Sequence, residues 1–258
     1  MARATALITG ASSGIGAELA KLCAAEGYDL VLVARRAAPM EALAASLARD
    51  HGVEARVLAA DLADPAAPEA ILERLGQTPI DILINNAGFG LQGPYAETDW
   101  VAEAHMIEVN VIALAHLTKL FLPAMLARRC GRILNVASTA AFVPGPLMAI
   151  YYSTKAFVVS FSHAIAAETA GTGVTVTVLC PGATITGFEE AAGLQSTKLF
   201  RGPAMDAASV ARCGYRAMMA GKPEVIAGAR NRLMIFGARF APRTLLAKIT
   251  RGLNSKAE

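Results

Sequence analysis

The sequence predicts an α/β fold in which a doubly wound parallel sheet carries helices on both faces, and three observations support this prediction. Short β-compatible runs alternate along the chain with longer helical patterns, which is typical of parallel sheets. The first run leads directly into a glycine-rich turn and then into a helix. Two later runs, residues 30–33 and 81–84, lack polar alternation, as strands covered on both faces should.

The expected elements follow one another along a single domain. Residues 5–9 form the first expected strand, and residues 17–26 form the helix after it. Further strands are expected at residues 30–34, 55–60, 80–84, 131–137 and 174–180, with a weaker last one at residues 224–227. The chain of 258 residues shows no internal repeat or linker, so residues 1–258 are expected to share one core.

The turn after the first expected strand has the spacing Gly-x-x-x-Gly-x-Gly. Gly10 permits a tight turn, Gly14 lets the backbone approach a ligand closely, and Gly16 allows the helix to pack on the strand. Backbone N–H groups and the positive end of the helix then favour a phosphate group. The run indicates a dinucleotide site formed by Gly10, Ser12, Ser13, Gly14, Ile15 and Gly16. The alternative is an ordinary glycine-rich turn, which is frequent in proteins.

A second pattern lies downstream, where Tyr151 and Lys155 are four residues apart. On a helix, residues i and i+4 share one face, so the ammonium group of Lys155 can lie beside the phenol of Tyr151. A phenol normally loses its proton near pH ~10, and a neighbouring cation lowers its pKa. The pair is therefore expected to transfer a proton near neutral pH.

With these two patterns in this order, nearly the whole chain resembles the short-chain dehydrogenase/reductase family, which has a Rossmann fold. Other segments match further motifs of the family: Asp61-Leu62, Asn85-Asn86-Ala87-Gly88, Asn110, Ser138, and Pro181-Gly182 with Thr186. The resemblance implies that the first of these motifs holds the adenine and that the last closes over the nicotinamide. The cofactor contacts that it implies are Asp61, Leu62, Asn86, Ala87, Gly88, Pro181, Gly182, Thr184 and Thr186, together with Tyr151 and Lys155.

The resemblance also implies roles for four catalytic residues. Tyr151 would donate a proton to a carbonyl oxygen that Ser138 holds, while the nicotinamide delivers hydride to the carbon. Lys155 and the charge of the oxidised cofactor would lower the pKa of Tyr151. Lys155 would also bind the ribose hydroxyls, and Asn110 would position a water that leads to bulk solvent. Tyr152 is the alternative proton donor, but only Tyr151 lies thirteen residues after Ser138, which is the interval in the family.

The end of the second expected strand bears on the choice of cofactor. A carboxylate there would accept hydrogen bonds from the 2′-hydroxyl of NAD, whereas guanidinium groups pair with the 2′-phosphate of NADP. The residues at this place are Arg35 and Arg36. NADP(H) is therefore the predicted cofactor. The alternative is that the two arginines form a solvated charge pair at a strand end.

The segments that the resemblance places around the substrate are mostly apolar. They are residues 89–91, 140–144 and 188–200, the last within an expected lid at about 183–205. Gly187 and Gly193 could let this lid move. Few fixed charges accompany the segments, which favours a lipophilic ketone or aldehyde as substrate. The alternative is that these side chains pack the lid against the domain and touch no ligand.

Composition favours a protein inside the cell. Apolar residues make up 54% of the chain, yet no uninterrupted apolar run reaches the ~18 residues that span a bilayer. The nearest run, residues 107–126, contains His116, Lys119 and Pro123, so a buried amphipathic helix is expected. No signal-peptide pattern precedes the first strand, and a cytoplasmic location is expected. The four cysteines and four histidines are scattered, so we expect free thiols and no metal site.

Charge is distributed unevenly along the chain. From Lys198 onward, twelve Lys or Arg against three acidic residues give a net charge of +9, whereas the preceding residues carry −6. In the C-terminal segment, about residues 228–258, bases mix with bulky apolar residues, which is compatible with peripheral contact with an anionic membrane. The alternative is that the apolar residues cover the pocket or a subunit contact. No recognised nucleic-acid-binding module accompanies the segment, so nucleic acid is not an expected partner.

Two hypotheses about function follow. The favoured one is an NADPH-dependent oxidoreductase that interconverts a carbonyl and an alcohol on a small apolar substrate, and the resemblance implies a homodimer or homotetramer. The second is a non-catalytic NADP-binding protein with a regulatory or scaffolding role, since a fold alone does not fix function. The presence of Asn110, Ser138, Tyr151 and Lys155 together favours the enzyme.

Overall fold

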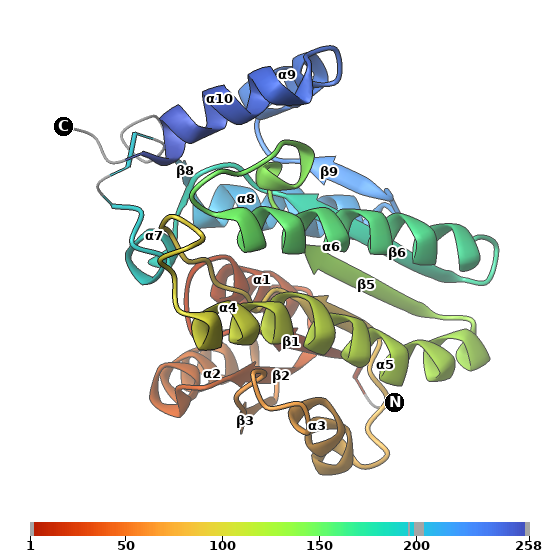
Figure 1. Ribbon diagram of the computed structural model, residues 1–258. Coiled ribbons are helices and arrows are strands. Elements are labelled where there is room, and N and C mark those ends of the chain that lie inside the picture. The colour runs from red at the N-terminus through yellow and green to blue at the C-terminus, as the bar shows by residue number, and fades with distance from the viewer. Residues whose placement is uncertain (1–2, 196, 199–203, 256–258) are drawn as a thin grey trace.

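The computed structural model describes residues 3–195, 197–198 and 204–255. One sheet of parallel strands lies between two layers of helices, as Figure 1 shows. The strand order is β3-β2-β1-β4-β5-β6-β9, which is that of a doubly wound, Rossmann-like fold with one further strand at the edge. The predicted fold class is therefore confirmed.

Each of the runs predicted to be a strand belongs to this sheet. The strands are β1 (Thr5–Thr9), β2 (Asp29–Ala34), β3 (Ala55–Ala59), β4 (Ile82–Asn85), β5 (Gly131–Val136), β6 (Val174–Cys180) and β9 (Glu224–Ile226). Strands β1 and β4 are buried along their whole length, because helices cover both faces and apolar side chains suit such positions. The short β9 pairs with the last three residues of β6 and forms the edge of the sheet.

Two helix layers enclose the sheet. The first contains α1 (Gly14–Ala25), α2 (Ala37–His51) and α8 (Ala207–Met219), which share a core with strand residues such as Ile8 and Leu32. The second contains α3 (Ala67–Leu75), α5 (Leu114–Arg128) and α6 (Ala149–Glu168), which pack on the opposite face around Leu7 and Leu83. Adjacent residues Leu7 and Ile8 therefore serve different cores, as the alternation of side chains along a strand requires.

One long helical stretch runs through the second layer. It consists of α4 (Trp100–Ile107), the π-helical turn η1 (Glu108–Ala113) and α5. Within the described chain, Trp100–Arg128 is the one helical stretch whose length and apolar composition would allow it to cross a membrane. Side chains such as Leu117 and Phe121 pack on the sheet, so the predicted burial is confirmed for one face of the stretch, while 39% of its most apolar window is buried in all. Pro123 lies inside α5, and the departure from α-helical geometry falls at η1 instead.

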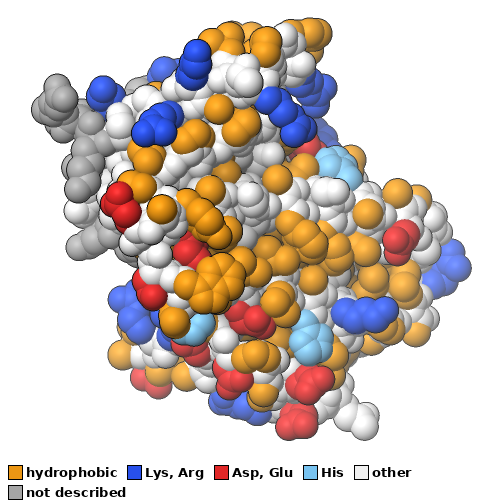
Figure 2. All heavy atoms as spheres, viewed as in Figure 1, with side chains coloured by type: hydrophobic (Ala, Val, Ile, Leu, Met, Phe, Trp, Pro, Cys, Tyr) orange, Lys and Arg blue, Asp and Glu red, His pale blue; other side chains and the backbone are white. Residues whose placement is uncertain are grey.

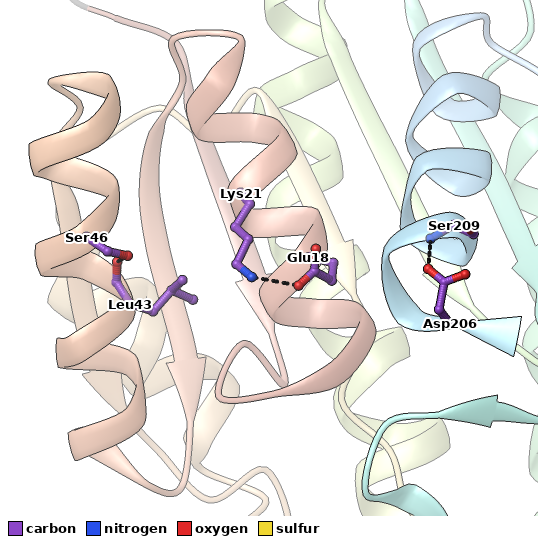
Figure 3. Close-up of polar contacts among 6 residues, drawn as sticks. All are labelled: Glu18, Lys21, Leu43, Ser46, Asp206 and Ser209. Atoms are coloured by element: carbon purple, nitrogen blue, oxygen red, sulfur yellow. Dashed lines mark hydrogen bonds and ion pairs between the residues drawn. The ribbon is translucent and has the colours of Figure 1, made fainter.

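Local polar contacts lie along the helices of the first layer, and one of them caps α8 (Figure 3). The carboxylate of Asp206 accepts a hydrogen bond from the backbone N–H of Ser209 at 2.7 Å and caps α8. This hydrogen bond lowers the pKa of Asp206. On α1, the exposed ion pair between Lys21 and Glu18 has a distance of 2.7 Å, and pairs of this kind stabilise a helix by only ~0.5 kcal/mol or less.

The segments after β6 complete one end of the molecule. A small second sheet pairs β7 (Thr184–Ile185) with β8 (Met205–Asp206), and α7 (Phe188–Ala191) lies between them in the chain. These elements fall in the segment predicted to be a lid, of which residues 196 and 199–203 lie outside the described residues. The helices α9 (Ala229–Ala238) and α10 (Arg243–Asn254) form an outer layer at the top of Figure 1. The predicted C-terminal segment is described as far as residue 255.

Candidate active site

The candidate site lies at the carboxyl ends of β1 and β4, where the strand order reverses. Hydrogen bonds join these two strand ends. Oγ1 of Thr9 accepts from the backbone N–H groups of Asn86 and Ala87, each at 3.0 Å. Nδ2 of Asn86 donates in return to the carbonyl of Thr9 at 2.9 Å. The loops that leave the two strands are therefore held in a fixed relation to each other.

The three glycines of the run after β1 lie where there is no room for a side chain. Gly10 has a φ of 67°, in the left-handed region, and a Cβ on it would lie 2.7 Å from Nδ2 of Asn86. A Cβ on Gly14 would lie 2.8 Å from Cβ of Thr186, and Gly16 faces the carbonyl of Gly10. Helix α1 begins at Gly14, three residues earlier than predicted, because the last part of the run is its first turn. Bare backbone at a helix N-terminus suits a pyrophosphate group.

One cavity of about 830 Å³ brings most of the predicted site residues together. Its lining includes Gly10, Ser12, Ser13, Gly14, Ile15, Arg35, Arg36, Asp61, Leu62, Asn86, Ala87, Gly88, Ser138, Tyr151, Lys155, Pro181, Gly182, Thr184 and Thr186. Two predicted residues are not in this lining. Gly16 packs behind the turn against Gly10, and Asn110 is 1% exposed behind Gly88.

Arg35 and Arg36 line the cavity directly after β2. Both side chains are exposed, and neither forms an ion pair within the part of the chain that the structure describes. Asp61 is also exposed, in the loop after β3, where its Oδ1 accepts from the N–H of Ala63 at 3.1 Å. The two guanidinium groups are therefore available to bind an anion at this end of the cavity.

Helix α6 places Tyr151 and Lys155 in the wall of the cavity. Nζ of Lys155 donates to the carbonyl of Val136, at the end of β5, at 2.9 Å, and it lies 5.8 Å from the centre of the Tyr151 ring. Burial lowers the pKa of Lys155 to about 8, because an ammonium group loses hydration when it is buried. Lys155 therefore exchanges its proton close to physiological pH.

The pKa of Tyr151 shifts in the direction opposite to the predicted one. Burial raises the pKa of Tyr151; interaction with the side chain of Ser138 opposes this rise, and Tyr152 adds to it. The prediction that Lys155 lowers the pKa of Tyr151 is wrong for the protein groups alone, because burial dominates and the ammonium group bonds to Val136. Tyr151 therefore keeps its proton at neutral pH, as a proton donor must.

Ser138 follows β5 and begins the short 3-10 helix η2 (Thr139–Phe142). Its Oγ accepts a hydrogen bond from the N–H of Ala140 at 3.1 Å and donates to the carbonyl of Pro181 at 3.4 Å. These two contacts fix the hydroxyl in the wall of the cavity that also holds Tyr151. Ser138 has one O–H, so it holds the oxygen of a carbonyl compound beside the phenol only when that O–H turns away from its long contact with Pro181.

Asn110 is placed by the π-helical turn η1 and fixes a loop of the site. Its Oδ1 accepts from the N–H of Phe89 at 3.1 Å, and its Nδ2 donates to the carbonyl of Phe89 at 3.0 Å and to Oγ1 of Thr154 at 3.1 Å. A Cβ on Gly88 would lie 2.9 Å from Oδ1 of Asn110 and 3.3 Å from Nζ of Lys155. Asn110 thus lies close to Lys155, and its role in positioning a water stays a prediction.

The described part of the predicted lid lies against Tyr151. The ring of Phe188, on α7, lies with its centre 5.3 Å from that of Tyr151. Leu194 is buried and lines the cavity as well. Phe188 and Leu194 pack against the domain and also line the cavity, and their contact with a substrate stays a prediction. Phe200, the last residue of the predicted substrate stretch, lies outside the described residues.

Sequence reasoning missed Asn254, a fully buried residue at the end of α10. Its Oδ1 accepts from the hydroxyl of Tyr152 at 3.2 Å, and its Nδ2 donates to the carbonyl of Pro146 at 3.0 Å. Its own carbonyl accepts from Nε2 of Gln92 at 3.1 Å. Asn254 therefore ties the last helix to α6 and to two loops near the site. The one local signal is a lone amide side chain in a basic and apolar helix.

Comparison with known proteins identifies the family. A family model for short chain dehydrogenase matches residues 4–196. The chain is 37% identical over 177 residues to a very-long-chain 3-oxoacyl-CoA reductase of Phaeosphaeria nodorum, which covers 66% of this chain and 52% of that protein. It is 34% identical to a solved short-chain dehydrogenase from Sphingobium yanoikuyae in complex with NADPH, with a TM-score of 0.83 over 92% of this chain and 93% of that one. The chain belongs to the short-chain dehydrogenase family.

Family membership supports a nicotinamide cofactor but does not choose between the two forms. Another similar structure, a short-chain dehydrogenase/reductase from Burkholderia phymatum in complex with NAD, is 27% identical, with a TM-score of 0.82 over 91% of this chain and 92% of that one. Members of the family are oxidoreductases that act on carbonyl or alcohol substrates with NAD or NADP. The matched part of the chain spans about half the length of the 3-oxoacyl-CoA reductases.

Proposed function

We propose that this protein is an NADPH-dependent oxidoreductase that interconverts a carbonyl and an alcohol on a lipophilic substrate. The observation that supports the proposal most is that Ser138, Tyr151 and Lys155 line one cavity with the glycine run at the start of α1. The run offers a cradle for phosphate, and the three side chains offer a hydroxyl, a proton donor and a cation. A binding protein without chemistry needs the cradle but not the three side chains.

The residues of the site can be assigned steps in the reductive direction. The nicotinamide, when bound, supplies the hydride that reduces the carbonyl carbon. Ser138 holds the carbonyl oxygen, and Tyr151, which burial keeps protonated, donates its proton to that oxygen and so completes the alcohol. Lys155, held by the carbonyl of Val136, stabilises the phenolate that remains. In the oxidative direction the same phenolate accepts the proton of the alcohol.

The preference for NADP(H) rests on Arg35 and Arg36. Both lie exposed directly after β2 and line the cavity, at the position where a carboxylate would otherwise bind the 2′-hydroxyl of the adenosine ribose. A guanidinium group binds a phosphate with paired, charge-assisted hydrogen bonds, each worth ~1.5–3 kcal/mol. A 2′-phosphate therefore gains more at this position than a 2′-hydroxyl does.

The proposed substrate is a lipophilic ketone or aldehyde. The cavity wall near Tyr151 includes a cluster of apolar side chains, namely Phe89, Met148, Phe188 and Leu194. Such a wall gains free energy by burying an acyl chain or ring and gains little from a polyhydroxylated substrate. Similarity to a very-long-chain 3-oxoacyl-CoA reductase supports the same chemical class.

The test is cofactor consumption by the purified protein across a panel of carbonyl compounds graded in chain length and polarity. The panel includes 3-oxoacyl thioesters and small ketoses, and each matching alcohol is assayed with the oxidised cofactor. We expect turnover with NADPH at a kcat/KM at least tenfold above that with NADH, and a rise with chain length. Tight NADPH binding without turnover in either direction would favour the non-catalytic alternative. A preference for ketoses would refute the lipophilic substrate.

A further inference from the structure

The last two helices expose several large apolar side chains. Leu233, Phe236 and Phe240 are 72%, 57% and 78% exposed, and the two phenylalanine rings lie 5.4 Å apart. On α10, Leu245 and Ile249 are 48% and 52% exposed. Single exposed apolar residues are common, but a continuous set of this kind marks an interaction surface. This surface takes no part in the oxidoreductase chemistry proposed above.

On α9 the apolar side chains point away from the body of the protein. Leu233 and Phe236, at i and i+3, share one face of α9, and Phe240 lies in the turn after the helix with its ring against that of Phe236. Ile235 lies on the opposite face and is buried, with 2% of its surface exposed. The core thus holds α9 by one side and leaves the other to solvent.

Arginines flank the apolar face of α9 on both sides. At ~100° per residue, Arg230 lies on one flank of this face and Arg232 on the other, and Arg239 directly follows the last residue of α9. All three side chains are exposed. An apolar centre between cationic flanks is the arrangement of a helix that lies flat in the surface of an anionic bilayer.

Helix α10 continues this surface with the same chemistry. Exposed Lys248 and Arg251 lie beside the apolar arc of α10, while Thr250 and Asn254 face inwards and are buried. Figure 2 shows basic and hydrophobic side chains gathered together over the layer of α9 and α10, at the top of the view. Asn254 and Ile235 anchor this layer in the fold, so anything that holds it also orients the whole domain.

The charge of this surface distinguishes between two binding partners, a second copy of this chain and an anionic bilayer. Residues 229–255 contain six Lys or Arg and no Asp or Glu. In a twofold contact between copies of this chain, the same patch meets itself, so six cations would face six cations. Phospholipid headgroups supply the missing negative charge, and the adjoining acyl chains accept apolar rings. The charge therefore favours an anionic bilayer.

We propose that α9 and α10 dock on an anionic phospholipid membrane, with Leu233, Phe236 and Phe240 inserted at the level of the headgroups. Docking would place an enzyme for lipophilic carbonyl compounds at the surface where such compounds concentrate. Membrane docking itself does not depend on the proposed oxidoreductase function, since it involves side chains outside the cavity. Only the benefit of this placement rests on the proposed function.

The test is cosedimentation of the purified protein with phosphatidylcholine vesicles, with and without phosphatidylserine, at low and at raised salt. An apolar variant combines Leu233→Ser, Phe236→Ser and Phe240→Ser. A charge variant combines Arg230→Gln, Arg232→Gln and Arg239→Gln. The control for the apolar variant combines Trp100→Ser and Val101→Ser. The control for the charge variant combines Lys21→Gln, Arg49→Gln and Arg56→Gln. All five residues are exposed on other parts of the molecule.

We expect binding that requires phosphatidylserine and weakens with salt, because screening shortens the reach of charges to ~10 Å at 0.1 M. The apolar variant should bind at least ~10-fold more weakly and the charge variant about 100-fold more weakly, whereas the controls should bind as the parent does. Equal thermal unfolding temperatures would exclude misfolding as the cause. No binding at low salt, or equal binding by all variants, would overturn the proposal. The proposal would also be overturned if the parent protein did not bind vesicles and the apolar variant formed a smaller oligomer than the parent. That result would assign the face to self-association.

Discussion

The ammonium group of Lys155 donates a hydrogen bond to the backbone carbonyl of Val136 at 2.9 Å, and the residue is only 5% exposed. The fold thus buries a cation in the wall of the cavity with an uncharged carbonyl as its hydrogen-bond partner. Such a cation loses hydration that one carbonyl does not replace. Lys155 therefore reduces the stability of the fold at neutral pH, which is expected of a residue kept for chemistry.

The first prediction concerns stability. The pKa of Lys155 is about 8 in the folded chain against an ordinary 10.5, so between these values the unfolded chain binds more protons. The stability of the parent protein should rise with pH across this window and be lowest below it. Replacing Lys155 by Met should raise the free energy of unfolding at pH 7 by about 2 kcal/mol, from ~3 kcal/mol of relieved desolvation less ~1 for the lost hydrogen bond.

Urea unfolding of both proteins from pH 7 to pH 10 measures this effect. The advantage of Lys155→Met should shrink towards pH 10, while Lys248→Met, at an exposed position, should show no such trend. If the Lys155→Met protein were less stable than the parent at pH 7, burial of the charge would not be the dominant effect.

The second prediction concerns the pH dependence of catalysis. The kcat/KM for NADPH reports groups of the free enzyme. Because Lys155 loses its charge near pH 8, kcat/KM for NADPH should fall about tenfold per pH unit above that value. Tyr151 keeps its proton over this range because burial raises its pKa, so it adds no second decline. A profile that stays flat to pH 9.5 would contradict the assignment.

The third prediction concerns the choice of cofactor. Arg35→Ala and Arg36→Ala should each weaken NADPH binding by about 10- to 100-fold, since each removes a charge-assisted contact with the 2′-phosphate. NADH binding should change less than threefold. Calorimetric titration with both cofactors measures the effect, and Arg49→Ala on α2 is the matched control. Equal losses for NADPH and NADH would mean that the arginines hold some other part of the cofactor.

The fourth prediction concerns the fastening of α10. Asn254→Ala removes both hydrogen bonds of the side chain and leaves the hydroxyl of Tyr152 and the carbonyl of Pro146 without their partner. The free energy of unfolding should fall by about 2–4 kcal/mol. KM for the carbonyl substrate should rise more than kcat falls, because the loops shift while Tyr151 stays in place. Leu253→Ala, at the exposed neighbouring position, is the control. A kcat loss with unchanged KM would contradict this account.

The sheet could be predicted from the sequence because its signals are local. A short uninterrupted apolar run such as residues 30–33, bounded by turn residues, is typical of a strand covered on both faces, and the structure places it in β2. The predicted start of α1 differs from the observed one because a glycine turn and the first turn of a helix look alike in sequence. The cavity residues belong to motifs that each follow a strand, and the sheet gathers strand ends at one edge.

Other features depend on contacts that no local pattern shows. The direction of the Tyr151 pKa shift depends on how deeply the fold buries the ring, which spacing to Lys155 does not reveal. Asn254 forms a hydrogen bond with Tyr152, which is 102 residues away in the sequence. The π-helical turn that places Asn110 has no distinct composition. The predicted oligomer and cytoplasmic location depend on surfaces and surroundings outside one chain, and both stay predictions.

The most direct test of the central claim compares Tyr151→Phe with Tyr152→Phe in NADPH-dependent reduction of the best carbonyl substrate. If Tyr151 is the proton donor, Tyr151→Phe should lower kcat by about 10²- to 10⁴-fold with NADPH binding retained. Tyr152→Phe should keep most of the activity and lose only ~1 kcal/mol of stability with its hydrogen bond to Asn254. Retained turnover in Tyr151→Phe together with its loss in Tyr152→Phe would contradict the proposed active site.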